Sequence, residues 1–203
     1  MSIALAGRTA VVTGAASGIG AALARHAAML GMAVAACDRD AAGLDALAAE
    51  LVAADVAHVV RPVDITDVDA LRSFASECTA LPPVALLFAN AGVLRGGRIL
   101  DMPIGAWRLL TEVNVIGAVS TLQAFVPAMI ALGEPAHVVV TGSTGSMTCG
   151  ASLGAYCATK HALWPIVEAL RAELDGTTVG ASLLMPGAVS TPMFDAIDPD
   201  RPT

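Results

Sequence analysis

This sequence predicts an α/β fold in which helices cover both faces of a parallel sheet, and three observations support that class. Short runs rich in β-branched and other apolar residues alternate with longer Ala/Leu-rich segments along almost the whole chain. The short runs are nearly all apolar, as expected of parallel strands that are buried on both faces. The 203 residues contain no internal repeat or polar linker, so we expect one domain, residues 1–203, with a doubly wound sheet.

The elements follow from these runs in chain order. The strand candidates are Thr9–Thr13, Ala33–Cys37, His58–Val63, Val84–Ala89, His137–Thr141 and Val179–Met185. The helix candidates are Ile19–Leu30, Ala41–Ala54, Asp67–Ala80, Ile104–Leu132 and Tyr156–Leu174. Right-handed βαβ connections between them would place helices on both sides of the sheet.

Composition excludes several classes of protein. Hydrophobic residues make up 56% of the chain and charged residues 14%, which excludes intrinsic disorder. Aromatic residues make up only 3%, so the core is expected to consist of Ala, Val, Leu, Ile and Met. The formal net charge of −7 argues against a nucleic-acid partner.

The expected location is the cytoplasm, without a membrane partner. The first residues lack the basic segment and the long apolar run of a signal peptide. The uncharged stretch from Val113 to Gly133 is long enough to span a bilayer, but polar residues interrupt it, so we interpret it as a buried helix. The four cysteines form no Cys-x-x-Cys pair, which favours reduced thiols. The four histidines have no metal-ligand spacing, so no metal site is expected.

A glycine-rich turn follows the first predicted strand. Its sequence, Thr13-Gly14-Ala-Ala-Ser-Gly18-Ile-Gly20, precedes an Ala-rich helix. Glycines there allow backbone N–H groups to approach a pyrophosphate, and the helix N-terminus adds partial positive charge. Such short motifs also occur as plain strand-to-helix turns.

The second predicted strand ends at an acidic residue, Asp38, which is followed by Arg39. A carboxylate at this position can accept hydrogen bonds from adenosine ribose hydroxyls, and it would repel a 2′-phosphate. The neighbouring arginine could instead pair with that phosphate. Because the carboxylate of Asp38 would repel the phosphate, we expect NAD in preference to NADP.

The single tyrosine and the single lysine of the chain, Tyr156 and Lys160, lie four residues apart. This spacing places both side chains on one face of a predicted helix. An ammonium near a phenol stabilises the phenolate and lowers its pKa, so that the phenol becomes a usable acid or base. Ser143, which follows the fifth predicted strand, could hold a substrate oxygen near this phenol.

These motifs occur in a characteristic order together with Asn90-Ala91-Gly92, Asn114 and Pro186-Gly187. From Thr9 to about Thr191, the combination resembles the classical short-chain dehydrogenases/reductases. The resemblance implies a Rossmann-like domain that holds both the cofactor and the catalytic residues. It implies that Tyr156 is the general acid/base, Ser143 polarises the substrate carbonyl, Lys160 binds the nicotinamide ribose and lowers the tyrosine pKa, and Asn114 positions a water. The implied cofactor-binding residues are Gly14, Ser17, Gly18, Ile19, Gly20, Asp38, Arg39, Asp64, Ile65, Asn90, Ala91, Gly92, Tyr156, Lys160, Pro186, Gly187, Val189 and Thr191.

Members of this family usually continue past the position of Thr191 to a further strand, so we expect the C-terminal strand of the sheet to be missing here. The expected function is NAD-dependent interconversion of a secondary alcohol and a ketone. An NADP-dependent carbonyl reductase is the alternative within the class. A dinucleotide-binding module or structural remnant without turnover is the alternative outside it.

The expected substrate is a small, uncharged and rather apolar alcohol or ketone. Arg95 and Arg98 are expected to face solvent, and the residues expected to line the substrate pocket are Val93, Leu94, Met147, Leu153, Met193 and Phe194. The uncharged helix after Val113 should bury its outer side against another copy of the chain, because soluble monomers rarely expose a large apolar patch. A homodimer or homotetramer is therefore expected, and the family resemblance points the same way.

Overall fold

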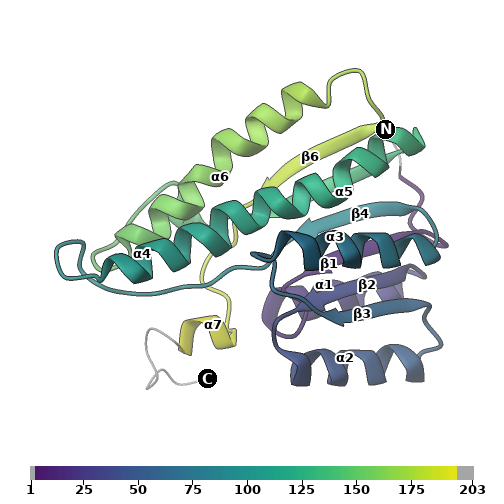
Figure 1. Ribbon diagram of the computed structural model, residues 1–203, viewed down its shortest axis with the longest axis horizontal. Coiled ribbons are helices and arrows are strands. Elements are labelled where there is room, and N and C mark those ends of the chain that lie inside the picture. The colour runs from purple at the N-terminus through teal and green to yellow at the C-terminus, as the bar shows by residue number, and fades with distance from the viewer. Residues whose placement is uncertain (1–2, 196–203) are drawn as a thin grey trace.

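The computed structural model describes residues 3–195, in which six parallel strands form one sheet between two layers of helices (Figure 1). The strands are β1 (Thr9–Thr13), β2 (Ala33–Asp38), β3 (His58–Pro62), β4 (Val84–Ala89), β5 (Ala136–Thr141) and β6 (Val179–Leu184). All six predicted strands are confirmed, with ends that differ by at most one residue. The α/β class is confirmed as well.

The strand order, β3-β2-β1-β4-β5-β6, places β1 at the centre of the sheet beside β4. The chain first builds outward from β1 through β2 to β3, and then returns to the other side of β1. The direction of winding therefore reverses between β1 and β4. In open α/β sheets, ligands bind in the crevice beyond the carboxyl ends of the strands at this kind of reversal.

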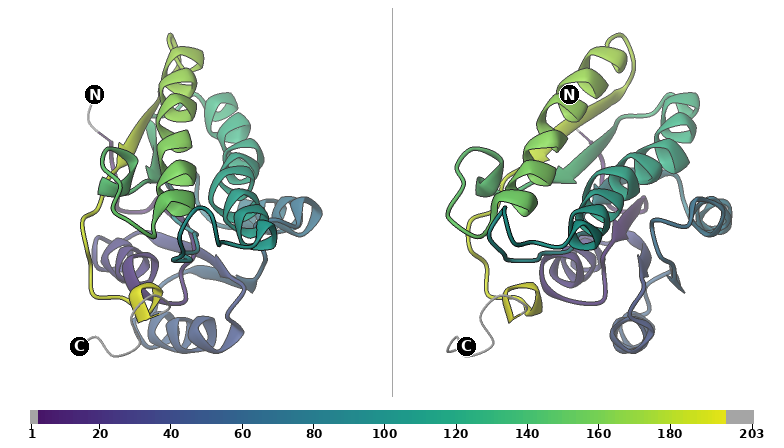
Figure 2. Two further views of the ribbon diagram at one scale, coloured as in Figure 1. Left: turned by 90° about the vertical axis from the view of Figure 1, so that its left-hand side faces the viewer. Right: turned by 60° about the vertical axis from the view of Figure 1, so that its left-hand side comes forward.

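The helices divide between the two faces of the sheet (Figure 2). One face is covered by α1 and α2, which bury alanines and leucines against the sheet, and the other by α3, α5 and α6. Asp40 and Asp67 cap α2 and α3 by accepting two backbone N–H groups each. The helices are α1 (Gly18–Met29), α2 (Ala41–Ala53), α3 (Val68–Glu77), α4 (Ile104–Thr111), α5 (Ala118–Leu132), α6 (Gly154–Glu173) and the short α7 (Pro192–Asp195), with 3-10 turns η1 (Cys78–Ala80) and η3 (Thr144–Ser146).

The predicted continuous helix Ile104–Leu132 contains a π-helical turn, η2 (Glu112–Gly117), between α4 and α5. Asn114 lies in this turn, and its side chain hydrogen-bonds to the backbone of Val93 on a neighbouring segment. Gly117 ends the turn against Ile65, where a Cβ would lie 2.5 Å from the isoleucine Cδ1. Turns of this kind inside α-helices are frequent at functional sites.

The run Ile104–Leu132 is also the one helical segment among residues 3–195 that is long and apolar enough to cross a membrane. In the structure it packs against the sheet. Leu122, Phe125, Val126 and Met129 of α5 are buried in the core, and the Phe125 ring makes an edge-on contact with Phe74 of α3. This packing identifies the segment as a core helix.

Candidate active site

A cavity of about 340 Å³ opens at the carboxyl ends of the strands, where the direction of winding reverses between β1 and β4. It is lined by the turns that follow β1, β2, β4 and β5, by the start of α6, and by the segment between β6 and α7. Segments far apart in the sequence therefore meet at one place. Of the predicted cofactor-binding residues, all except Asp64 and Ile65 line this cavity, and these two line a smaller adjoining cavity of about 70 Å³.

The glycine-rich turn lines one side of the cavity, and only glycine fits at two of its positions. Gly14 has a φ of +69°, and a Cβ on it would lie 2.7 Å from the Cα of Ala91. A Cβ on Gly20 would lie 1.9 Å from the carbonyl oxygen of Gly14. Ser17, the N-cap of α1, makes no side-chain capping bond, so the helix N-terminus can accept an anion. This cradle fits the pyrophosphate of a dinucleotide.

Asp38 connects the end of β2 to the glycine-rich turn. Its Oδ2 accepts the N–H of Ala16 at 3.1 Å, and its Oδ1 accepts the N–H of Asp40 at 3.0 Å. Both bonds fix the carboxylate at the edge of the cavity, where Arg39 lies beside it. The carboxylate thus presents a negative charge at the end of the cavity remote from Tyr156.

Asn90 joins three strand ends at the back wall of the cavity. Its Nδ2 donates to the carbonyl oxygen of Thr13 at 3.2 Å, and its Oδ1 accepts the hydroxyl of Thr141 at 3.1 Å. The hydroxyl of Thr13 in turn accepts the N–H groups of Asn90 and Ala91 at 3.0 and 3.1 Å. These bonds hold the ends of β1, β4 and β5 together and keep the cavity open between them.

Ser143, Tyr156 and Lys160 lie together at the other end of the cavity. Tyr156 is 9% exposed, and its ring and the Ser143 Oγ both lie within 4 Å of the position that a Cβ on Gly145 would take. The Ser143 Oγ accepts the N–H of Gly145 at 3.0 Å. The Nζ of Lys160 lies 6.0 Å from the centre of the Tyr156 ring and donates to the carbonyl oxygen of Thr141 at 2.8 Å. The predicted proximity of these three side chains is therefore present in the structure.

Burial shifts the pKa values of both Tyr156 and Lys160. Desolvation raises the pKa of Tyr156 above its ordinary value of 10.0, and the hydrogen bond from Ser143 lowers it in part. Desolvation lowers the pKa of Lys160 to about 8, so that the ammonium still predominates at neutral pH. The expected lowering of the tyrosine pKa by Lys160 is therefore not what this structure has. The ammonium is directed to Thr141 rather than to the phenol, and burial of the phenol prevails.

Asn114 does not line the cavity but lies directly behind its wall, 1% exposed. Its Nδ2 donates to the Val93 carbonyl oxygen at 2.9 Å and to the Thr159 hydroxyl at 3.0 Å, and its Oδ1 accepts the Val93 N–H at 2.8 Å. A Cβ on Gly92 would lie 3.1 Å from the Asn114 Oδ1 and 3.2 Å from the Lys160 Nζ. The amide group thus has its donors satisfied within the protein and ties the π-helical turn to α6.

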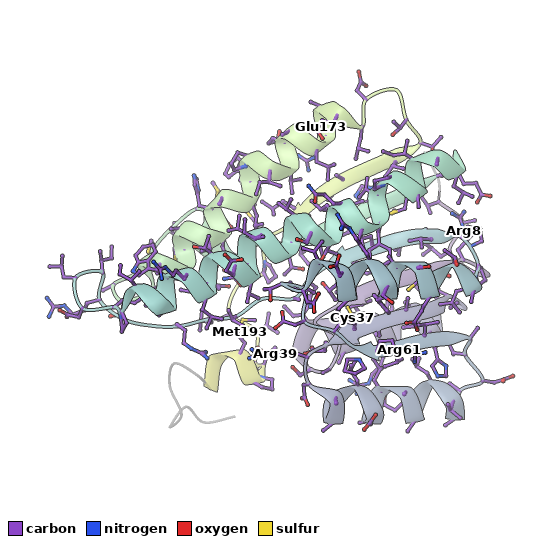
Figure 3. The ribbon with its side chains drawn as sticks, viewed as in Figure 1. Arg8, Cys37, Arg39, Arg61, Glu173 and Met193 are labelled. Atoms are coloured by element: carbon purple, nitrogen blue, oxygen red, sulfur yellow. The ribbon has the colours of Figure 1, made fainter. Side chains whose placement is uncertain are left out.

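The mouth of the cavity is formed by apolar side chains and one arginine. Leu94 and Met193 line it, and Met193, which lies on α7, is labelled in Figure 3. Arg95 and Arg98 are both exposed, as expected, and Arg95 also lines the cavity. One guanidinium nitrogen of Arg95 donates to the carbonyl oxygen of Leu94 at 2.8 Å.

Several residues that matter to this geometry were not identified from the sequence. Thr141 accepts the Lys160 ammonium through its backbone, and Thr159 bonds to Asn114 from the facing helix. Neither contact has a sequence signal, because each depends on how two separate elements pack. Gly142 also lines the cavity, and its position directly after β5 could have indicated this. Val93, which was expected from the sequence at the substrate pocket, lines the cavity as well.

Comparisons with known proteins agree on one family. The family model described as short chain dehydrogenase matches residues 8–202. The chain is 39% identical over 197 residues to 1-deoxy-11-beta-hydroxypentalenate dehydrogenase of Streptomyces exfoliatus, which covers 96% of this chain and 72% of the relative. A short chain dehydrogenase/reductase from Burkholderia phymatum in complex with NAD superimposes with a TM-score of 0.93 at 35% identity, over 99% of this chain and 72% of the other. An alcohol dehydrogenase from Thermococcus sibiricus complexed with 5-hydroxy-NADP superimposes with a TM-score of 0.87 at 29% identity, over 96% and 82%.

Proposed function

The chain belongs to the short-chain dehydrogenases, a family of oxidoreductases that bind NAD(P), and from this premise we propose that it interconverts a secondary alcohol and a ketone with NAD. The observation that carries the proposal is the meeting of Ser143, Tyr156 and Lys160 at one end of a cavity whose other end has a glycine cradle. A module that only bound a dinucleotide would have no need for a buried phenol beside a hydroxyl and the only lysine of the chain. The free thiols of Cys37, Cys78, Cys149 and Cys157 support a cytoplasmic location.

Most of the cavity is assigned to the cofactor. We assign the pyrophosphate to Gly14, Ser17, Gly18, Ile19 and Gly20, and the adenosine ribose to Asp38 with Arg39 beside it. The remaining contacts are assigned to Asp64 and Ile65 at the adenine, Asn90, Ala91 and Gly92 along the cleft, and Pro186, Gly187, Val189 and Thr191 with Tyr156 and Lys160 at the nicotinamide. When bound, NAD supplies the acceptor for the hydride that leaves the carbinol carbon.

Tyr156 is proposed to exchange the proton of the substrate hydroxyl. In the oxidative direction its phenolate accepts that proton, and in the reductive direction its phenol returns it to the carbonyl oxygen. Ser143 donates a hydrogen bond to the same substrate oxygen and stabilises the charge that develops there. Lys160 carries the positive charge nearest to the phenolate, and it orients the nicotinamide ribose. Asn114, whose amide is bonded to Val93 and Thr159, maintains the π-helical turn that positions a water behind Lys160.

The substrate is proposed to be a secondary alcohol with an apolar body. Leu94 and Met193 at the mouth support this choice. Arg95 favours a second candidate, an alcohol of the same kind that also carries a carboxylate, since its guanidinium is the basic group at that mouth. The relative from Streptomyces exfoliatus is named for a hydroxy-carboxylate, which supports the same candidate.

This function is tested by following NADH absorbance with pairs of secondary alcohols that differ only in a carboxylate. We expect NADH to form with at least one pair, and the ketone to accumulate in equal amount. Arg95→Gln should raise KM only for the carboxylate members if they are the better substrates. Binding of NAD without NADH formation from any member of the set would favour the binding-module alternative.

Asp38→Ala is expected to raise kcat/KM with NADP, relative to NAD, by about ten-fold or more. The carboxylate would lie beside a 2′-phosphate, and juxtaposed like charges cost several kcal/mol. Steady-state kinetics with both cofactors measures the ratio, and Asp45→Ala, an exposed aspartate on α2, is the control that should leave it unchanged. Equal use of both cofactors by the unaltered protein, or an unchanged ratio in Asp38→Ala, would contradict the preference for NAD.

We also propose that two copies of the chain associate through α5 and α6. The outer side of α5 carries no charge, and Pro127 and Ile130 on it are exposed, as are Ile116 in the preceding η2 and Trp164 on α6. Light scattering should therefore give twice the 20.4 kDa chain mass, or four times that mass for a tetramer. Ile130→Glu should shift the mass toward the monomer, whereas Val52→Glu on the opposite layer should not. A monomer mass for the unaltered protein at micromolar concentration would contradict this assembly.

A further inference from the structure

Ser146 is a buried serine that the proposed mechanism does not use, yet it joins two segments that carry candidate catalytic groups. Its side chain is 2% exposed, and it does not line the cavity. Its Oγ donates to the carbonyl oxygen of Lys160 at 2.8 Å and accepts the N–H of Ser143 at 3.3 Å. One hydroxyl therefore connects the backbone of Ser143 to the backbone of α6.

A second contact fastens the same turn to the same helix. The Nδ1 of His161 donates to the carbonyl oxygen of Ser146 at 2.7 Å. Within the turn, the Oγ of Ser143 accepts the N–H of Gly145, while the Oγ of Ser146 accepts the N–H of Ser143. This reciprocal arrangement is a capping box, and it fixes the backbone from which the Ser143 hydroxyl projects.

The distance between the Ser143 hydroxyl and the Tyr156 phenol depends on how η3 sits on α6. The chain that links η3 to α6 runs from Met147 to Leu153 and includes exposed residues and a turn, so it cannot by itself fix that distance. The hydroxyl of Ser146 is one of two side-chain connections between η3 and the turn of α6 that carries Lys160, and it is the one that also reaches the backbone of Ser143. Its loss would leave the carbonyl of Lys160 and the N–H of Ser143 without this partner in a buried region.

We propose that Ser146 is a positioning residue that holds the Ser143 hydroxyl against the Tyr156 phenol, a role that rests on the proposed alcohol–ketone reaction. Serine and threonine hydroxyls often bond to a nearby carbonyl within their own helix and matter only for local stability. The bond from Ser146 instead crosses fourteen residues, from one catalytic segment to another. If Ser146 only capped its own short helix, its removal would not alter the pKa of Tyr156.

The direction of the effect follows from the groups that face the phenol, which are Ser143, Cys157 and Lys160. Among them, the hydrogen bond from Ser143 lowers the pKa of Tyr156, whereas burial and Cys157 raise it. Loosening Ser143 weakens a contribution that favours the phenolate. The pKa of Tyr156 should therefore rise further when the Ser146 hydroxyl is removed.

The experiment uses the fact that Tyr156 is the only tyrosine. Carbon-13 placed at the tyrosine Cζ gives one NMR signal, whose shift at neutral pH reports the phenol hydrogen bond and whose titration reports the pKa, with circular dichroism as the check on folding. Ser146→Ala removes the hydroxyl. Ser146→Cys keeps the packing and retains only a weak donor, and Thr148→Ala removes an exposed hydroxyl of the same loop that bonds only to Thr144.

Ser146→Ala is expected to move the Cζ signal and to raise the tyrosine pKa by about half a unit or more, with a smaller change in Ser146→Cys and none in Thr148→Ala. With substrate, kcat should fall about ten-fold or more while KM for NAD stays unchanged, since misplacement affects the reacting groups and not the glycine cradle. An unmoved signal and pKa in folded Ser146→Ala would overturn the proposal. The NMR readout needs no substrate, so failure of the proposed reaction would appear separately, as absence of turnover in the unaltered protein.

Discussion

Replacing Tyr156 with phenylalanine is expected to lower kcat/KM for alcohol oxidation by about 10²–10⁴-fold, the range attributed to a general acid/base. The substitution removes only the hydroxyl that meets Ser143, and the ring keeps its buried packing against Leu94 and Met102. NADH binding, measured by fluorescence, should remain within a factor of about two, because the glycine cradle lies at the other end of the cavity. A variant that keeps more than about a tenth of the original kcat/KM would exclude Tyr156 as the proton carrier.

The pH dependence of alcohol oxidation should report the ionisation of Tyr156. Since the phenolate is the base and the pKa of Tyr156 is raised, the rate is expected to climb as pH rises from neutral to about 8, the pKa at which Lys160 loses its charge. Reduction uses the protonated phenol, so its rate should stay level in the same range. The climb should be absent from the residual activity of Tyr156→Phe.

Gly20→Ala is expected to destabilise the protein by about 3 kcal/mol and to abolish cofactor binding. Its Cβ would lie 1.9 Å from the carbonyl oxygen of Gly14 and 2.8 Å from the Nδ2 of Asn90. The contact is with backbone, which cannot rotate away, so α1 must move from the turn that its N-terminus supports. Urea unfolding measures the stability, and NADH fluorescence measures binding.

The matched control is Gly105→Ala on α4, where nothing lies within 4 Å of the new Cβ. Its unfolding free energy should change by less than about 1 kcal/mol, in the stabilising direction, because alanine is the better helix former. Retention of cofactor affinity by Gly20→Ala would mean that the turn can open without cost, and that it is not the rigid cradle inferred for the pyrophosphate.

The strands could be predicted from the sequence because each is an apolar run buried on both faces. The core contains few aromatic residues, and Phe74 and Phe125 supply its one aromatic pair among residues 3–195. The helix Ile104–Leu132 was predicted as continuous because apolar periodicity does not reveal one widened turn. That turn depends on Asn114 bonding to Val93, a contact between segments that the sequence separates by twenty-one residues.

The candidate site was predictable as a set of residues and not as an electrostatic environment. The spacing of Tyr156 and Lys160 placed both on one face of α6, as the structure has them. It could not indicate that the lysine donates to Thr141, nor that burial raises the tyrosine pKa. Nor could the sequence indicate that Arg95 lines the cavity and bonds to the backbone of Leu94. Ionisation and side-chain direction depend on packing between elements.

The central claim is hydride transfer between a carbinol carbon and NAD, and isotope transfer tests it most directly. A secondary alcohol that carries deuterium on its carbinol carbon is incubated with the protein and NAD, and the reduced cofactor is examined by mass spectrometry. The proposed function predicts NADH heavier by one deuterium, formed in equal amount with the ketone and about 10²–10⁴-fold more slowly in Tyr156→Phe. NADH without deuterium, or bound NAD that is never reduced by any alcohol in the set, would contradict it.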